Sequence, residues 1–189
     1  MRLAAPSLLA AGLMLTAPAF AATAVPVGHF DAVSLSGGGH VTIRHGAVQS
    51  VTFVQGSPEF TTVKIKHGND LDIEACNSRC PEHYDLEIEI VTPDLKAAAI
   101  EGGGHVTAES GFSNTGELSA AVDGGGHLDL TALKAEKVSA AVNGGGHIEV
   151  TALRDLSAAV DGGGSIVYHG NPQVSQAIDG GGSVSRAMK

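Results

Sequence analysis

Runs of three glycines divide this chain at nearly regular intervals. They begin at Gly102, Gly124, Gly144, Gly162 and Gly180, and an earlier copy begins at Gly37. The steps from the first of the five onward are 22, 20, 18 and 18 residues. Self-similarity at such a period is typical of repeat architectures, in which each unit buries its apolar face against the next. The period therefore constrains the fold more strongly than any local propensity.

The residues that flank each glycine run alternate between apolar and polar. Leu118, Ala120 and Val122 share one face of the segment before a run, and Leu128 and Leu130 share one face of the segment after it. A period of two with one apolar face predicts half-buried strands. Helix is excluded because each glycine would cost about 1 kcal/mol relative to alanine in a helix interior.

Stacked copies of this unit predict an all-β fold, a small right-handed parallel β-helix. Strands about 4.8 Å apart give every backbone group a partner in the next coil, and the hand follows from the crossover rule. The glycine that begins each run is predicted to be a structural corner. Positive φ suits glycine there, and a Cβ would meet the same corner of the neighbouring coil.

The first 21 residues predict a secretory signal peptide. Arg2 is followed by an apolar run and by the small-residue site around Ala19 and Ala21, the order that such peptides share. We expect residues 22–189 to form a single domain, with regular coils from about 95 to 189 and an irregular β-rich N-terminal cap. Export places the protein in the periplasm or at the cell surface. No other apolar run is long enough for a membrane helix.

Cys76 and Cys80 are the two cysteines of the chain. In an exported protein, an even pair this close in sequence is most simply a disulfide. A redox motif would need two intervening residues, and a structural zinc site would need a second pair. We therefore predict a disulfide that closes a short loop.

Histidines at equivalent positions are the strongest hint of chemistry. His105, His127 and His147 each follow a glycine run, and Asp129 and Glu149 come two residues after the second and third of them. In strict register the imidazoles would form a ladder beside carboxylates, which are suitable Zn or Cu ligands. The competing interpretation is a solvated, self-stacking ladder, because copying a repeat aligns identical side chains whether or not they bind anything.

Composition excludes some partners and disfavours catalysis. With 11 basic and 20 acidic residues the net charge is −9, which disfavours nucleic acid. The chain has no Trp and only two Tyr, so it lacks the platforms on which sugars usually stack. The catalytic candidates are charged residues without a convergent motif: Arg44, Lys64, Lys66, Asp129 and Glu149. We therefore expect a protein that is not an enzyme.

Three segments together carry a resemblance to a known family. They are HFDAVSLSGGGHVTI, DLEIEIVTPDLKAAAIEGGGHV and DGGGSIVYHGNPQVSQAIDGGGSV. In this order they resemble the head GIN domain family, described as auto-transporter adhesins, and Gly162 to Pro172 is the most specific part. The resemblance implies an exported β-helix-like domain of bacterial envelopes without an established activity. The GGGH corners and the cysteine loop depart from the family's usual pattern.

We therefore interpret the chain as an exported structural or interaction module of the cell envelope, adhesive in character. Its partner would be another protein or the envelope surface, with no membrane span, and the sequence leaves open whether it forms a homo-oligomer. The alternative is a divalent-metal-binding envelope protein that uses the histidine ladder. No cofactor is expected beyond that metal.

Overall fold

The computed structural model describes residues 22–66, 69–77, 80–113 and 115–188, and in this part the secondary structure is strand without helix. The predicted signal peptide lies outside the described residues. The strands are β1 (Thr23–Val25), β2 (Ala32–Gly37), β3 (His40–His45), β4 (Ser50–Gln55), β5 (Thr61–Lys66), β6 (Asp70–Ala75), β7 (Glu87–Thr92), β8 (Ala97–Gly102), β9 (His105–Ala108), β10 (Thr115–Gly124), β11 (His127–Gly144), β12 (His147–Gly162), β13 (Ser165–Gly170), β14 (Gln173–Gly180) and β15 (Ser183–Arg186).

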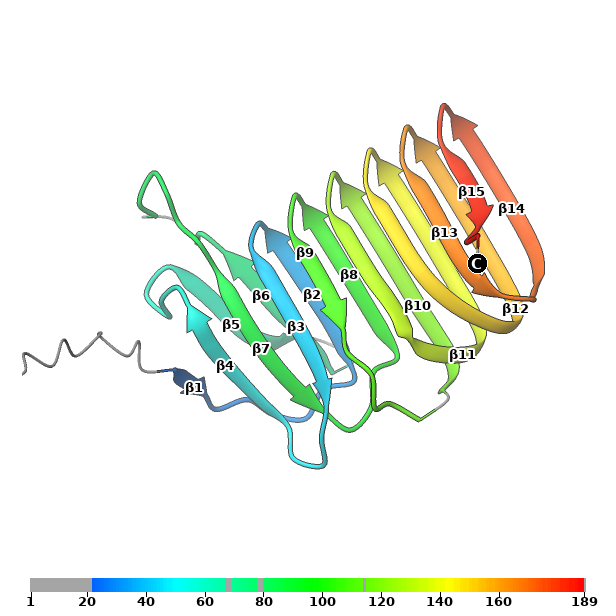
Figure 1. Ribbon diagram of the computed structural model, residues 1–189. Helices are drawn as coiled ribbons and strands as arrows, with labels where there is room; N and C mark the ends of the chain where they lie inside the picture. The colour runs from blue at the N-terminus through cyan, green and yellow to red at the C-terminus, as the bar shows by residue number, and fades with distance from the viewer. Residues whose placement is uncertain (1–21, 67–68, 78–79, 114, 189) are drawn as a thin grey trace, which may run out of the picture.

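The strands form a β-solenoid with two walls of stacked parallel strands (Figure 1). The first wall contains the strands that precede the corners, in the order β6, β2, β8, β10, β11, β12 and β14. The second wall contains the strands that follow them, in the order β7, β3, β9, β11, β12, β13 and β15. The long strands β11 and β12 run from the second wall of one coil into the first wall of the next. The prediction of an all-β stacked architecture is thus confirmed, and the right hand stays a prediction.

The glycine corners lie directly over one another. Gly124 pairs in register with both Gly102 and Gly144, and Gly144 in turn with Gly162. At Gly144 φ is 109°, and a Cβ there would lie 2.7 Å from the carbonyl oxygen of Gly124. Both the left-handed backbone and the close approach of the previous coil therefore require glycine at this corner.

The N-terminal end of the stack is closed by antiparallel strands. β5 pairs antiparallel with β6 at the edge of the first wall. β4 pairs antiparallel with β7 at the edge of the second wall, and β1 pairs antiparallel with β4. This arrangement confirms the predicted irregular β-rich cap. The sheet therefore ends in short antiparallel strands, β1 on one side and β5 on the other, and short edge strands offer few unpaired backbone groups for aggregation.

The first coils are not stacked in chain order. β2 and β3 form a coil that lies between the β8–β9 coil and the β6–β7 coil, which is outermost. The corner of the outermost coil is a longer loop in place of a glycine run. The Cys76–Cys80 disulfide closes part of this loop, with the Cα atoms 5.4 Å apart. Cys76 has a φ of 67°, so the chain bends here through a left-handed residue as it does at the glycine corners.

The core fills the space between the two walls. Inward-facing residues of the regular coils are small or branched, such as Ala140, Val142 and Ile148, and each is at most 2% exposed. The N-terminal coils bury larger side chains, including Phe30 and Phe53. Among the described residues, no helix is present that has the length and hydropathy to cross a membrane.

Candidate functional site

The outward side chains of the second wall place the histidines in one column. His40, His105, His127 and His147 occupy equivalent positions in β3, β9, β11 and β12. The rings of His105 and His127 stack with centroids 4.6 Å apart and planes 1° apart, and those of His127 and His147 with centroids 4.8 Å apart. His40 and His105 are tilted, with centroids 5.6 Å apart. Strand spacing sets these distances, since neighbouring parallel strands lie about 4.8 Å apart.

Burial disfavours the charged form of one histidine in this column. Partial burial lowers the pKa of His105 from its ordinary value of 6.5, and the charges that His127 and His40 carry when protonated lower it further. The carboxylate of Asp129 opposes this shift. A neutral imidazole retains a nitrogen lone pair, which is the form that binds metal.

One end of the column meets a carboxylate. The Nε2 atom of His147 lies 3.1 Å from Oε1 of Glu149, and its Nδ1 atom lies 2.6 Å from the hydroxyl of Ser165. On the other side of the same carboxylate, Nε2 of His169 lies 4.0 Å from Oε2. His127, His147 and Glu149 each offer a ligand atom, and these atoms lie within 4.8 Å of one another.

The other predicted ligands are arranged differently. Asp129 lies beside Glu149 in the register, but one of its oxygens accepts hydrogen bonds from the backbone N–H and the hydroxyl of Thr131, at 3.0 and 2.7 Å. His105 stacks on His127 but is not one of the three donors that lie close together. The structure therefore brings together three of the five residues that the sequence suggests.

Sequence analysis missed two residues of this surface, His40 and His169. The signal for His40 was present, because the run at Gly37 is also followed by histidine, and the register places it at the top of the column. His169 carried no such signal, because its coil has Ser165 at the position that follows the glycine run. Glu149 pairs in register with Val167 of the next coil, and His169 lies two residues after Val167 on the same strand. The contact therefore runs diagonally between coils.

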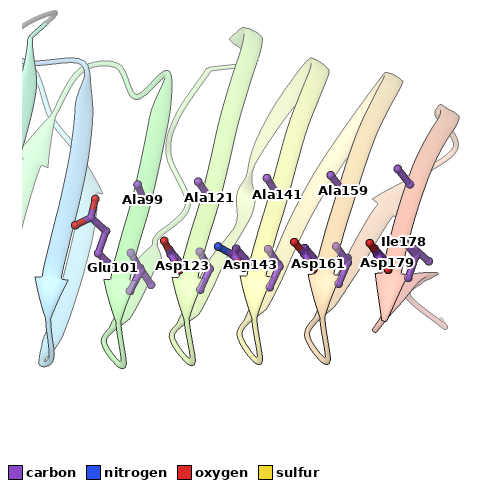
Figure 2. A pocket seen from close by; sticks show the side chains of 15 residues that line it. Ala99, Glu101, Ala121, Asp123, Ala141, Asn143, Ala159, Asp161, Ile178 and Asp179 are labelled. Carbon is purple, nitrogen blue, oxygen red and sulfur yellow. The ribbon is translucent and has the colours of Figure 1, made fainter. Parts of the chain in front are cut away.

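The first wall presents a shallow trough on its outer face. It has a volume of about 580 Å³. Outward alanines line it in a column across five strands, and a parallel column of polar residues, mostly carboxylates, runs beside them (Figure 2). The alanines are Ala99, Ala121, Ala141, Ala159 and Ala177, and the polar residues are Glu101, Asp123, Asn143, Asp161 and Asp179.

The remaining catalytic candidates form ion pairs with neighbouring carboxylates. Arg44 forms ion pairs with Glu89 and Glu109, at 2.6 and 3.0 Å. Lys64 and Lys66 both pair with the buried Asp72, at 3.5 and 2.7 Å. These cations are thus engaged in structural ion pairs and do not converge with Asp129 or Glu149 on one reactive centre.

A family model described as "Putative auto-transporter adhesin, head GIN domain" matches residues 110–172. This segment contains β10 to β13 and includes the three-donor group and the central part of the trough. The resemblance to this family is therefore confirmed in the regular coils. No curated protein has a matching sequence.

Several solved structures resemble this chain at low sequence identity. A crystal structure of a "putative adhesin" from Bacteroides fragilis is 20% identical, covers 88% of this chain and 96% of its own, and has a TM-score of 0.50. One from Parabacteroides merdae, also a "putative adhesin", is 13% identical, with coverages of 89% and 96% and a TM-score of 0.40. A "putative cell adhesion protein" from Clostridium sporogenes is 13% identical, with coverages of 89% and 98% and a TM-score of 0.42. The first likeness supports the solenoid fold.

Proposed function

We propose that this chain is an exported, non-enzymatic interaction module of the bacterial cell envelope, and that it adheres to its partner through the trough of the first wall. The observation that carries the proposal is the pairing of an alanine floor with a carboxylate border over five coils. The family model described as an adhesin spans the middle of this surface.

The chemistry of the trough favours a cationic partner. Alanine side chains leave room for an extended segment that lies across the strands, and they present apolar area without bulk. Glu101, Asp123, Asp161 and Asp179 place four carboxylates along one border. A partner with lysine or arginine side chains would match this charge, which favours both its selection and its rate of association.

Export is the second part of the proposal. It is supported by the predicted signal peptide and by the Cys76–Cys80 disulfide, since structural disulfides persist in oxidising compartments outside the cytoplasm. Protease treatment of intact cells, followed by detection of the chain, distinguishes the cell surface from the periplasm. Digestion in intact cells indicates the surface, and protection until the outer membrane is opened indicates the periplasm.

The trough is tested by binding of the labelled mature chain to isolated envelopes of the bacterium that produces it. Ala141→Arg combined with Ala159→Arg places two bulky cations in the trough at exposed positions. Ser183→Arg combined with Ser185→Arg is the matched control, because it adds the same charge at exposed positions of the second wall. Saturable binding should weaken at least tenfold in the first variant and less than twofold in the control. Equal binding by both variants would overturn the proposal.

A further inference from the structure

We propose that the second wall binds one divalent transition-metal ion, Zn²⁺ or Cu²⁺, through His127, His147 and Glu149. The site lies on the second wall and the trough on the first. Metal binding would therefore be a property separate from the proposed binding of a partner in the trough.

The three donors are already close to a coordination geometry. In a tetrahedral zinc site, metal–ligand bonds of about 2.1 Å place neighbouring donors about 3.4 Å apart. The His147 nitrogen and the Glu149 oxygen lie 3.1 Å apart, so this pair already fits. The His127 ligand atom lies within 4.8 Å of the other two. Metal binding would therefore require His127 to rotate out of its ring stack and approach the other two donors.

Ser165 is placed to orient the ligand ring. Its hydroxyl lies 2.6 Å from Nδ1 of His147, which leaves Nε2 directed at Glu149. Histidine ligands usually bond through their other ring nitrogen to a neighbouring acceptor, which fixes the tautomer and the ring plane. The hydrogen bond to Ser165 supplies that outer contact. A metal ion bound by both groups would take the place of the hydrogen that His147 Nε2 shares with Oε1 of Glu149 at 3.1 Å.

The donor set selects the class of ion. Two imidazoles and one carboxylate suit Zn²⁺ and Cu²⁺, whereas Ca²⁺ and Mg²⁺ prefer sites made of oxygen atoms. The side chains of His147 and Glu149 are 28% and 32% exposed. An ion can therefore enter from solvent, and water can complete its coordination.

Within the described residues, one group in the column brings three donor side chains together. Thr107, Asp129 and Glu149 occupy equivalent positions in β9, β11 and β12. Thr107 has no carboxylate, and Asp129 is engaged by Thr131. Of these three residues, Glu149 is the one whose carboxylate contacts the histidine of its own coil, His147. We therefore expect one ion per chain.

Titration of the mature chain, free of any affinity tag, with ZnCl₂ or CuCl₂ tests the site. Calorimetry should give one ion per chain for at least one of these metals. His147→Ala and Glu149→Gln should each weaken that binding at least tenfold. His40→Ala is the matched control, because it removes an exposed histidine of the same column at a distance from the carboxylate, and it should change the affinity less than twofold. The three positions face outward, so circular dichroism should show unchanged folding.

A thermal melt gives an independent measurement. The metal at about 100 times its dissociation constant should raise the Tm of the wild type by about 5–10 °C. The shift should be lost in Glu149→Gln and retained in His40→Ala. Superimposable melts with and without both metals would overturn the proposal. So would equal weakening by His40→Ala and His147→Ala, which would indicate diffuse binding along the column.

Discussion

The two ends of the solenoid differ although they continue the same stack. At the N-terminal end, antiparallel strands extend both walls, and residues such as Phe30, Leu71 and Ile90 are completely buried. At the C-terminal end, every residue of β14 is exposed although its register with β12 is regular. Repetition therefore reproduces backbone pairing along the whole stack, while burial depends on whether a further layer lies on top.

One column of inward-facing residues shows this difference most directly. It contains Ile100, Val122, Val142, Val160 and Ile178 in successive coils. The first four are 1–2% exposed, whereas Ile178 is 42% exposed. Isoleucine thus occupies both a buried position of this column, at Ile100, and an exposed one, at Ile178.

The largest expected effect comes from truncating these two isoleucines. Ile100→Ala should destabilise the fold by about 3–4 kcal/mol, because it leaves a cavity between packed coils. Ile178→Ala should cost about 1 kcal/mol or less, because little of its surface is enclosed. Chemical denaturation of both variants measures the difference. Equal costs would show that the last coil is covered in solution, for example by a second copy of the chain.

Substitution at a corner should have the next largest effect. Gly144→Ala places a methyl group against the carbonyl of Gly124 at a positive φ, and we expect a loss of about 2–3 kcal/mol. Gly145→Ala is the internal control, because a Cβ there meets nothing within 4 Å. Denaturant midpoints should separate the two variants. Similar midpoints would contradict the close approach of successive corners.

Amide hydrogen exchange should rank the two ends without any substitution. Amides that pair β11 with its neighbours should open only with global unfolding, since coils lie on both sides of this strand. Amides of β14 and β15 should open at free energies lower by at least about 2 kcal/mol, because the last coil is packed on one side alone. Uniform protection from β11 to β15 would argue against an open C-terminal end.

Much of the regular region could be predicted from the sequence. The glycine period and the two-residue alternation determine the register of Gly124 over Gly102 and of His127 over His105, because stacking puts repeat-mates side by side. The N-terminal part could be predicted only in kind. The insertion of the β2–β3 coil between β8–β9 and β6–β7 depends on pairing between strands far apart in sequence, and no period encodes it.

The candidate metal site could be predicted as a column but not as a particular group of ligands. Periodicity places Asp129 and Glu149 at equivalent positions, yet Thr131 engages the first and His147 lies beside the second. Rotamers and local hydrogen bonds make this distinction, and repeat spacing carries no information about them. For the same reason the approach of His169 to Glu149 is visible only in three dimensions.

The smallest expected effect concerns the histidine column, which links the N-terminal coils to the regular ones. Burial lowers the pKa of His105 in the folded state below its ordinary value of 6.5. At a pH between the folded-state pKa and 6.5, His105 therefore binds a proton more readily in the unfolded chain than in the folded one. The stability contributed by neutral His105 is therefore complete above pH 6.5, decreases as the pH falls through that value and levels off below the folded pKa.

Melts of the wild type in the presence of a chelator should show this decrease. His105→Asn should reduce the slope in that window, and His83→Asn, at an exposed histidine outside the column, should retain it. An unchanged slope in His105→Asn would show that the column does not couple protonation to folding.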